Sequence, residues 1–263
     1  AVVATTIPQA VGYAYAAKHR GEQTVVVAFM GDGAAEEGAF HESLNFAAIK
    51  HLPLIFICEN NLLAIHTHQH QRQHVADISG MVRGYGIPSE RIDTNDTASI
   101  HACVTAAAGA IRAGQGGPVF VECMTCRWKE HVGPGDDFNL GYRSADDVQK
   151  WKDSDDIKVI GGKILTERRT QIEAEVEQEI QAAIQFAEES PFPDVAELYT
   201  DGFKESAATE LASAAITPSI LGREIGFADA VREALDQEMS RDKSVIVFGI
   251  DVDDPKAILG TTR

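Results

Sequence analysis

Polar side chains stand directly after two apolar runs in the first quarter of the chain. Asp32 comes just after TVVVAFM with a glycine on each side, and Asn61 comes just after PLIFIC and the pair Glu59 and Asn60. In a right-handed parallel βαβ unit both positions meet at one sheet edge. A carboxylate and an amide oxygen suit Mg²⁺, and bare backbone amides at a helix start favour an anion. The spacing therefore indicates a metal-bridged diphosphate as the joint ligand.

The surrounding sequence predicts the elements that position these residues. Near-continuous apolar runs alternate with amphipathic segments, which is typical of a doubly wound parallel sheet covered on both faces. We therefore predict an α/β fold of this type. The expected strands are 24–30, 53–58 and 118–125. One expected helix has Phe40, Leu44, Ala47 and Ala48 on one face, and another lies near 97–113.

A long polar helix follows at 166–189, and we expect it to pack against a partner. It places an apolar residue at every fourth position and stops before two prolines. Its apolar residues are Ile172, Val176, Ile180 and Ile184.

Composition limits the classes of partner. The chain has 263 residues, of which 44% are hydrophobic, and its 23 Lys and Arg against 40 Asp and Glu give a net charge of −17. Such a charge argues against nucleic acid or an anionic membrane as the main partner. No run approaches the roughly 18 apolar residues of a membrane span, and no signal peptide is recognisable. We expect a cytoplasmic protein, or a mitochondrial matrix protein if the source is eukaryotic.

Changes in composition along the chain predict two domains joined by a linker. We expect a diphosphate-binding domain at 1–204, an Ala- and Ser-rich linker at 205–222, and the start of a second α/β domain at 223–263. Within the last segment, EIGFADAVREALDQEM predicts a helix and KSVIVFGIDV a strand. The sequence starts without Met and stops soon after that strand, so we expect both ends to be incomplete.

The first motif resembles that of a known family. GDG, then 26 residues, then NN is the pattern of thiamine diphosphate enzymes. The whole stretch GDGAAEEGAFHESLNFAAIKHLPLIFICENN resembles the α subunit of the decarboxylating first component of 2-oxo acid dehydrogenase complexes. The resemblance implies the thiamine diphosphate-binding fold.

The resemblance also implies roles for individual residues. Asp32, the Asn61 side chain and the Leu63 carbonyl match the family's Mg²⁺ ligands, and Gly33 and Ala34 match backbone contacts to the diphosphate. The opening segment AVVATTIPQAVG resembles the part that meets the aminopyrimidine, and RWKEHVGPGDDFNLGYR resembles a mobile loop whose histidine reaches the diphosphate and the bound intermediate. Those two segments add Ala1, Val3 and the catalytic candidate His131.

One departure from the family bears on regulation. Regulated mitochondrial relatives carry a phosphorylatable serine after the loop histidine, whereas this chain has Val132. We therefore do not expect control by phosphorylation at that point.

The resemblance implies a reaction and its partners. With thiamine diphosphate and Mg²⁺, a 2-oxo acid is oxidatively decarboxylated and its acyl group passes to the lipoyl arm of an acyltransferase component. The segment from 223 resembles the opening of the family's β subunit, whose activating glutamate lies beyond Arg263 in relatives. We therefore expect this chain alone to be inactive, and a homo-oligomer, dimeric or higher, to be the working form.

Alternatives stay open for the reaction. The substrate is not fixed by these residues, so an acetoin or transketolase-like enzyme with the same cofactor competes with the 2-oxo acid dehydrogenase. A non-catalytic cofactor-binding paralogue is the competitor from another class. The substrate that is consumed distinguishes the 2-oxo acid dehydrogenase from the acetoin or transketolase-like enzyme. A glutamate facing the pyrimidine distinguishes an enzyme from the non-catalytic paralogue.

Other motifs have simpler interpretations. HTHQHQRQH could bind a metal, but a solvated loop with some histidines at the mouth of the site is preferred. The Cys123 and Cys126 pair has redox spacing but lies in a predicted strand, and we expect structural cysteines. Glu36 and Glu37 fit the first turn of a helix. Four cysteines are also too few for a disulfide framework: Cys58, Cys103, Cys123 and Cys126.

Overall fold

The computed structural model describes residues 2–75, 77–94, 96–200 and 224–247. The chain divides into two units, 1–188 and 189–263. The second unit contains the short 3₁₀ helix η3 (Val195–Tyr199) and helix α10 (Phe227–Arg241). Every element that bears on the predicted site belongs to the first unit.

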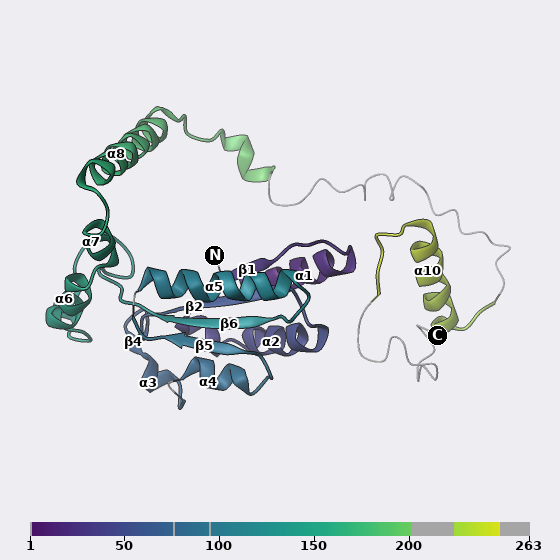
Figure 1. Cartoon of the computed structure of the whole chain (residues 1–263). Coiled ribbons are helices and arrows are strands. Elements are labelled where there is room, and N and C mark those ends of the chain that lie inside the picture. The colour runs from purple at the N-terminus through teal and green to yellow at the C-terminus, as the bar shows by residue number, and fades with distance from the viewer. Residues whose placement is uncertain (1, 76, 95, 201–223, 248–263) are drawn as a thin grey trace. The chain divides into compact units, whose positions relative to one another are not determined.

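The first unit is built on a parallel sheet of four strands in the order β1-β2-β6-β5 (Figure 1). In the register Gly31 pairs with Glu59, and Asn60 pairs with Met124. Because all four strands run the same way, their carboxyl ends lie at one edge of the sheet. The strands are β1 (Val26–Gly31), β2 (Leu54–Asn60), β5 (Ser89–Ile92) and β6 (Val119–Met124).

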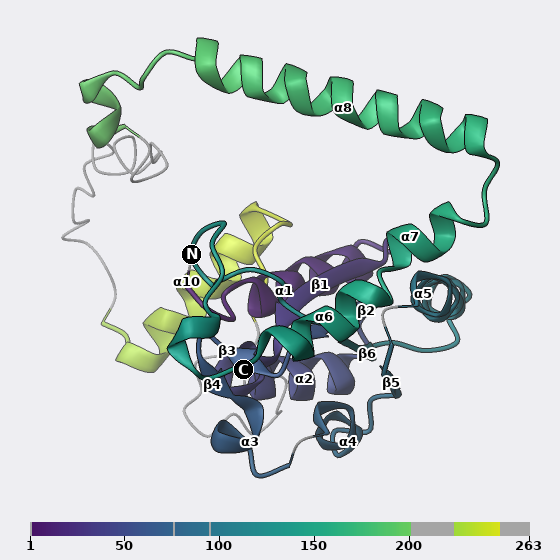
Figure 2. The same cartoon turned by 90° about the vertical axis from the view of Figure 1, so that its left-hand side faces the viewer.

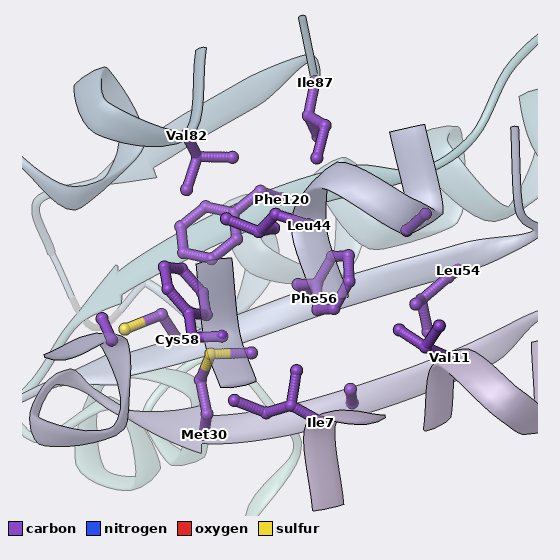
Figure 3. Packing of buried hydrophobic residues seen from close by; sticks show 14 of the residues in the cluster. Ile7, Val11, Met30, Leu44, Leu54, Phe56, Cys58, Val82, Ile87 and Phe120 are labelled. Atoms are coloured by element: carbon purple, nitrogen blue, oxygen red, sulfur yellow. The ribbon is translucent and has the colours of Figure 1, made fainter. Parts of the chain in front are cut away.

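Three helices cover one face of this sheet and enclose the larger core. Figure 3 shows Ile7 beside Met30 and Val11 beside Leu54, so the first helix packs along β1 and the neighbouring strand. Phe56 is fully buried in this cluster. The covering helices are α1 (Thr6–His19), α2 (Gly38–Lys50) and α4 (Ile78–Arg83).

The opposite face carries a smaller core under α5 (Thr97–Arg112), which Figure 2 shows across the sheet from α1, α2 and α4. The helix covers β2 and β6 through residues such as Ile57 and Val121. It leaves much of β1 open on this face, where Phe29 is 59% exposed. The sheet is thus covered on both faces but unevenly.

Short elements connect the sheet to the predicted loops. The 3₁₀ helix η1 (Asp32–Glu36) follows β1, and a hairpin of two very short strands follows β2. The remaining elements of the first unit are β3 (Leu63–Ala64), β4 (Thr67–His68), α3 (Gln69–Arg72), η2 (Phe138–Leu140), α6 (Ala145–Asp153), α7 (Asp156–Gly161) and α8 (Thr166–Glu189).

The predicted α/β fold is confirmed, as are the strands that became β1, β2 and β6 and the helices that became α2, α5, α8 and α10. The sequence pattern missed α1, α4 and β5, and it also missed α6 and α7 before the long helix. The apolar residues of the long helix α8 are exposed in this chain. Packing of α8 against a partner therefore stays a prediction.

The second expected domain is described only in part. The described start of the expected last strand, 243–247, is a turn at 243–244 followed by irregular backbone, which contradicts the predicted strand there. The rest of that strand and the expected linker 205–222 lie outside the described residues. The domain boundaries therefore stay predictions. In the ranges that the structure describes, no helix has the length and apolar character needed to span a membrane.

A pair of phenylalanines on opposite faces of the sheet tests this packing. We expect Phe56→Ala to lower the free energy of unfolding by about 3–5 kcal/mol, because it opens a cavity in the larger core. Phe29→Ala removes the same atoms from an exposed site and should cost less than about 1 kcal/mol. Urea unfolding of both variants measures the difference, and equal losses would contradict the assigned cores.

Candidate functional site

Asp32 and Asn61 meet at the carboxyl edge of the sheet, as their spacing predicts. Asp32 begins η1 directly after β1, and Asn61 follows β2 in the adjacent position. The Asp32 residue is only 1% exposed. Burial raises the pKa of its carboxyl group, while Arg72 and the backbone amides of Asp32 and Asn61 act in the opposite direction. The carboxylate is thus held in a confined, largely dry position.

The turn after β2 brings Leu63 to the same place. The Asn61 side-chain oxygen accepts a hydrogen bond from the Leu63 backbone N–H at 3.0 Å, which closes an Asx turn. Next to it, a Cβ atom at Gly33 would lie 3.0 Å from the Cβ of Ala64. Any larger residue at Gly33 would therefore press on β3. The structure brings Asp32, Gly33, Asn61 and Leu63 together.

A chain of buried amides lies beneath these residues, and the sequence analysis did not find it. Asn60 donates to Glu122 at 2.7 Å and to Gln69 at 3.2 Å. Gln69 donates in turn to Gln73 at 2.7 Å, and Gln73 donates to the Asp32 carbonyl at 3.2 Å. The fully buried Glu122 also accepts from the Ser79 backbone at 2.9 Å. Because each polar group has a partner, the interior of the sheet fixes the edge residues.

Arg72 is a further residue of the site that the sequence analysis missed. Its guanidinium donates to Asp32 at 2.6 Å and also bonds the Glu36 carboxylate. No local sequence pattern predicts the pairing of Arg72 with these carboxylates, since the partners lie far apart in the sequence. The expectation for Glu36 was wrong, because Glu36 ends η1 and faces Arg72, while α2 begins only at Gly38.

The loop expected to carry His131 is tied together by one carboxylate. Asp137, whose side chain is 1% exposed, accepts from Arg143 at 2.7 Å, from Arg127 at 3.3 Å and from the Tyr142 hydroxyl. Loss of solvent raises the pKa of the Asp137 carboxyl, but hydrogen bonds from Tyr142 and Arg143 outweigh it and leave that pKa below its ordinary value. The loop therefore has a charged, enclosed anchor.

This loop docks on the β3–β4 hairpin beside Asp32 and Asn61. Arg127 donates to the Ile65 carbonyl at 2.9 Å, and the His68 ring lies 2.6 Å from the Tyr142 carbonyl. The His66 ring also lies against that of Tyr142, with centroids 4.7 Å apart. The docking places the loop next to the site, with His131 itself exposed.

The histidine tract folds into a hairpin strand and a short helix and not a loop, but His66, His70 and His74 are exposed, as the prediction of a solvated segment requires. His66 lies in the turn between β3 and β4, His68 ends β4 and precedes α3, and Gln69 is buried. His66 and His68 contact Tyr142 of the docked loop, and a place for some of these histidines at the mouth of the site stays a prediction. In the described part of the chain, no three His, Cys, Asp or Glu side chains are grouped in a way that could hold a metal.

The opening segment reaches the same edge of the sheet. Since α1 packs along β1 with Ile7 beside Met30 (Figure 3), its start lies near the carboxyl end of that strand. Val3 lies in the turn before α1 and is exposed. Ala1 lies outside the described residues. Contact of Val3 with a cofactor stays a prediction.

The cysteines are free thiols. Burial is the main cause that raises the pKa of Cys123 to about 11 and that of Cys103 to about 12. Burial likewise raises the pKa of Cys126. A redox pair needs a stabilised thiolate, so these values favour structural cysteines.

A parallel sheet with polar groups gathered beyond its carboxyl ends defines an α/β protein with the usual place for a ligand site. Residues 1–196 match the family described as "Dehydrogenase E1 component". The chain belongs to this family, and the resemblance read from the GDG and NN motifs is confirmed.

The similar curated proteins are α subunits. The chain is 34% identical over 207 residues to the pyruvate dehydrogenase E1 component subunit alpha of Rhizobium meliloti, covering 76% of this chain and 58% of that protein. It is 35% identical over 214 residues to the mitochondrial human 2-oxoisovalerate dehydrogenase subunit alpha, covering 78% and 47%. It is 39% identical over 155 residues to the 3-methyl-2-oxobutanoate dehydrogenase subunit alpha of Mycobacterium tuberculosis, covering 59% and 41%. The chain thus spans about half the length of these relatives.

The loop anchor provides a test with a neighbouring control. We expect Asp137→Asn to speed tryptic cleavage within 127–143 by roughly tenfold, because it leaves buried guanidinium groups without their carboxylate. Asp136→Asn changes an adjacent, half-exposed carboxylate paired with Lys129 and should leave the cleavage rate nearly unchanged.

The lowered pKa of Asp137 also fixes the direction of the pH dependence. The anchor stabilises the loop above the ordinary carboxyl pKa of about 4, and its contribution is lost as the pH falls through the lower folded value. Equal cleavage rates for Asp137→Asn and Asp136→Asn would show that the loop is held by other contacts.

Proposed function

We propose that this chain binds thiamine diphosphate with Mg²⁺ and takes part in the oxidative decarboxylation of a 2-oxo acid, with transfer of the acyl group to a lipoyl group. The observation that carries the proposal is the meeting of Asp32 and Asn61 beyond the carboxyl ends of β1 and β2. Family membership and the names of the similar α subunits support it.

The donor groups suit Mg²⁺. Asp32 offers a carboxylate, Asn61 an amide oxygen and Leu63 a backbone carbonyl, and all three are the hard oxygen ligands that Mg²⁺ prefers. The Asn61 oxygen accepts one hydrogen bond from Leu63, which leaves a second lone pair for a cation.

The residues around the donors suit a diphosphate. Gly33 and Ala34 lie directly after Asp32, so their backbone amides can face an anion beside the cation. When bound, the thiazolium ring of the cofactor supplies the electron sink that loss of CO₂ requires. The chain's own task is to position this group and to bring His131 to it on the docked loop. We assign His131 to acyl transfer on that ground.

The substrate class and the partners complete the proposal. The similar proteins are named for pyruvate and for 2-oxoisovalerate, which is the same compound as 3-methyl-2-oxobutanoate, so a 2-oxo acid is the common class. We propose a lipoyl-bearing acyltransferase as acceptor and a homo-oligomer as the working form. We also propose that 1–204 forms the diphosphate-binding domain and that the chain from 223 opens the pyrimidine-binding one.

A decarboxylation assay on the full-length protein tests the proposal. Pyruvate, branched-chain 2-oxo acids, 2-oxoglutarate and acetoin are each supplied with thiamine diphosphate, Mg²⁺ and an artificial electron acceptor. We expect turnover of a 2-oxo acid that depends on both cofactors. Turnover of acetoin alone would overturn the substrate class, and cofactor binding without any turnover would favour a non-catalytic paralogue.

Asp32 provides the test of the cation site. We expect Asp32→Asn to weaken Mg²⁺-dependent binding of thiamine diphosphate by roughly 100-fold, because the ligand charge is lost while the fold persists. Calorimetric titration measures the affinity, and circular dichroism checks the fold. The control Asp93→Asn removes an exposed carboxylate that pairs with Arg91 and should bind normally. An unchanged affinity in Asp32→Asn would remove Asp32 from the cation site.

His131 separates binding from chemistry. We expect His131→Ala to keep the affinity for thiamine diphosphate within about threefold and to slow transfer to a lipoyl substrate by about 100-fold, because a loop residue acts on the reaction more than on binding. The control His74→Ala changes another exposed histidine. Normal acyl transfer in His131→Ala would rule out this role.

A further inference from the structure

Arg72 places its guanidinium between two acidic side chains at the predicted cation site. One terminal nitrogen lies 2.6 Å from Asp32 and the other bonds Glu36. The Arg72 side chain is 9% exposed and that of Asp32 2%. The pair is therefore shielded from water, and the attraction between its two charges is screened less than in a surface ion pair.

Neighbouring groups hold the guanidinium in this place. Its third nitrogen, Nε, donates to the Thr67 carbonyl at 3.1 Å. Gln73 donates to Glu36 at 3.0 Å and to the Asp32 carbonyl at 3.2 Å. It thereby ties the end of α3 to the same two residues of η1 that Arg72 contacts. All three nitrogens of the Arg72 guanidinium have a hydrogen-bond partner, which fixes the position of the side chain.

The arginine and a divalent cation require the same carboxylate. A guanidinium and a metal ion that share one buried carboxylate repel each other in a region of low dielectric constant. We propose that Arg72 competes with the divalent cation for Asp32, so that cation binding displaces the guanidinium from Asp32. The inference rests on the proposed function only in that Asp32 is taken as a cation ligand.

Glu36 makes the displacement feasible. It stays a partner for Arg72 after Asp32 has turned to the cation, and its side chain is 33% exposed, so the guanidinium can move toward solvent without losing all charge compensation. Only molecules in which Asp32 is free of Arg72 can bind the cation. The apparent cation affinity is therefore the intrinsic affinity multiplied by the fraction of such molecules. Cation binding also loosens the fastening of α3.

Direct binding of Mn²⁺ tests the competition without any turnover. The full-length protein is freed of divalent ions, and free Mn²⁺ is followed by electron paramagnetic resonance at about pH 8, where carboxyl groups are ionised. We expect Arg72→Gln to bind Mn²⁺ about tenfold more tightly than the unchanged protein. Arg72→Lys should lie between them, because a lysine keeps the charge but cannot bridge two carboxylates.

A matched control removes the same charge elsewhere. Arg83→Gln breaks an exposed pair with Asp77 and should leave Mn²⁺ affinity unchanged. Equal or weaker Mn²⁺ binding by Arg72→Gln would overturn the inference, and so would equal tightening by Arg83→Gln. If Arg72→Gln tightens Mn²⁺ binding but the unchanged protein does not bind thiamine diphosphate, the proposed function fails and the competition stands.

A second measurement needs no mutation and so is independent of the folding of any variant. Phenylglyoxal modification of Arg72 is followed by peptide mass spectrometry with and without Mn²⁺, and Arg83 serves as the internal reference. We expect Mn²⁺ to speed modification of Arg72 about fivefold or more, because a displaced guanidinium becomes accessible. An unchanged rate for Arg72 at a saturating Mn²⁺ concentration would overturn the inference.

Discussion

The parallel pairing of β1 with β2 is the constraint on which the site depends. Because Gly31 lies opposite Glu59, the two strands end at the same level, and Asp32 and Asn61 emerge side by side. The same edge receives the start of α1, which runs back along β1, and the loop that follows β6. A shift of this register by one residue would exchange the faces of every side chain and separate the donors.

Buried polar groups make that edge rigid. A carboxylate such as Glu122 in the middle of a sheet is costly unless its partners are complete. Here Asn60 and the Ser79 amide meet it from two directions. The amides that continue toward Gln73 connect this carboxylate to η1, so the interior charge and the surface acidic turn belong to one hydrogen-bonded system. Stability of the sheet and geometry of the site therefore have a common origin.

Local pattern predicted what local physics determines. The β-branched runs predicted β1, β2 and β6, and the position of Asp32 and Asn61 at one edge of the sheet followed from the βαβ rule. The sequence pattern did not predict β5, because Ser89–Ile92 is short, polar and at the edge of the sheet, where burial imposes no apolar pattern. The pairing of Arg72 with Asp32 was also missed, since it arises only when the hairpin folds back on η1.

The anchor at Asp137 joins the two ends of its loop, because Arg127 and Arg143 bind the same carboxylate. The stretch from 128 to 136 is thereby closed at its base by side chains outside it, and Arg143 also donates to the Lys129 carbonyl within it at 2.8 Å. Closure entropy grows slowly with length, so insertions and deletions between these ends cost little, whereas Gly133, with φ at +117°, resists exchange. Over evolutionary time the chemistry presented at the mouth can therefore diversify while the sheet beneath stays the same.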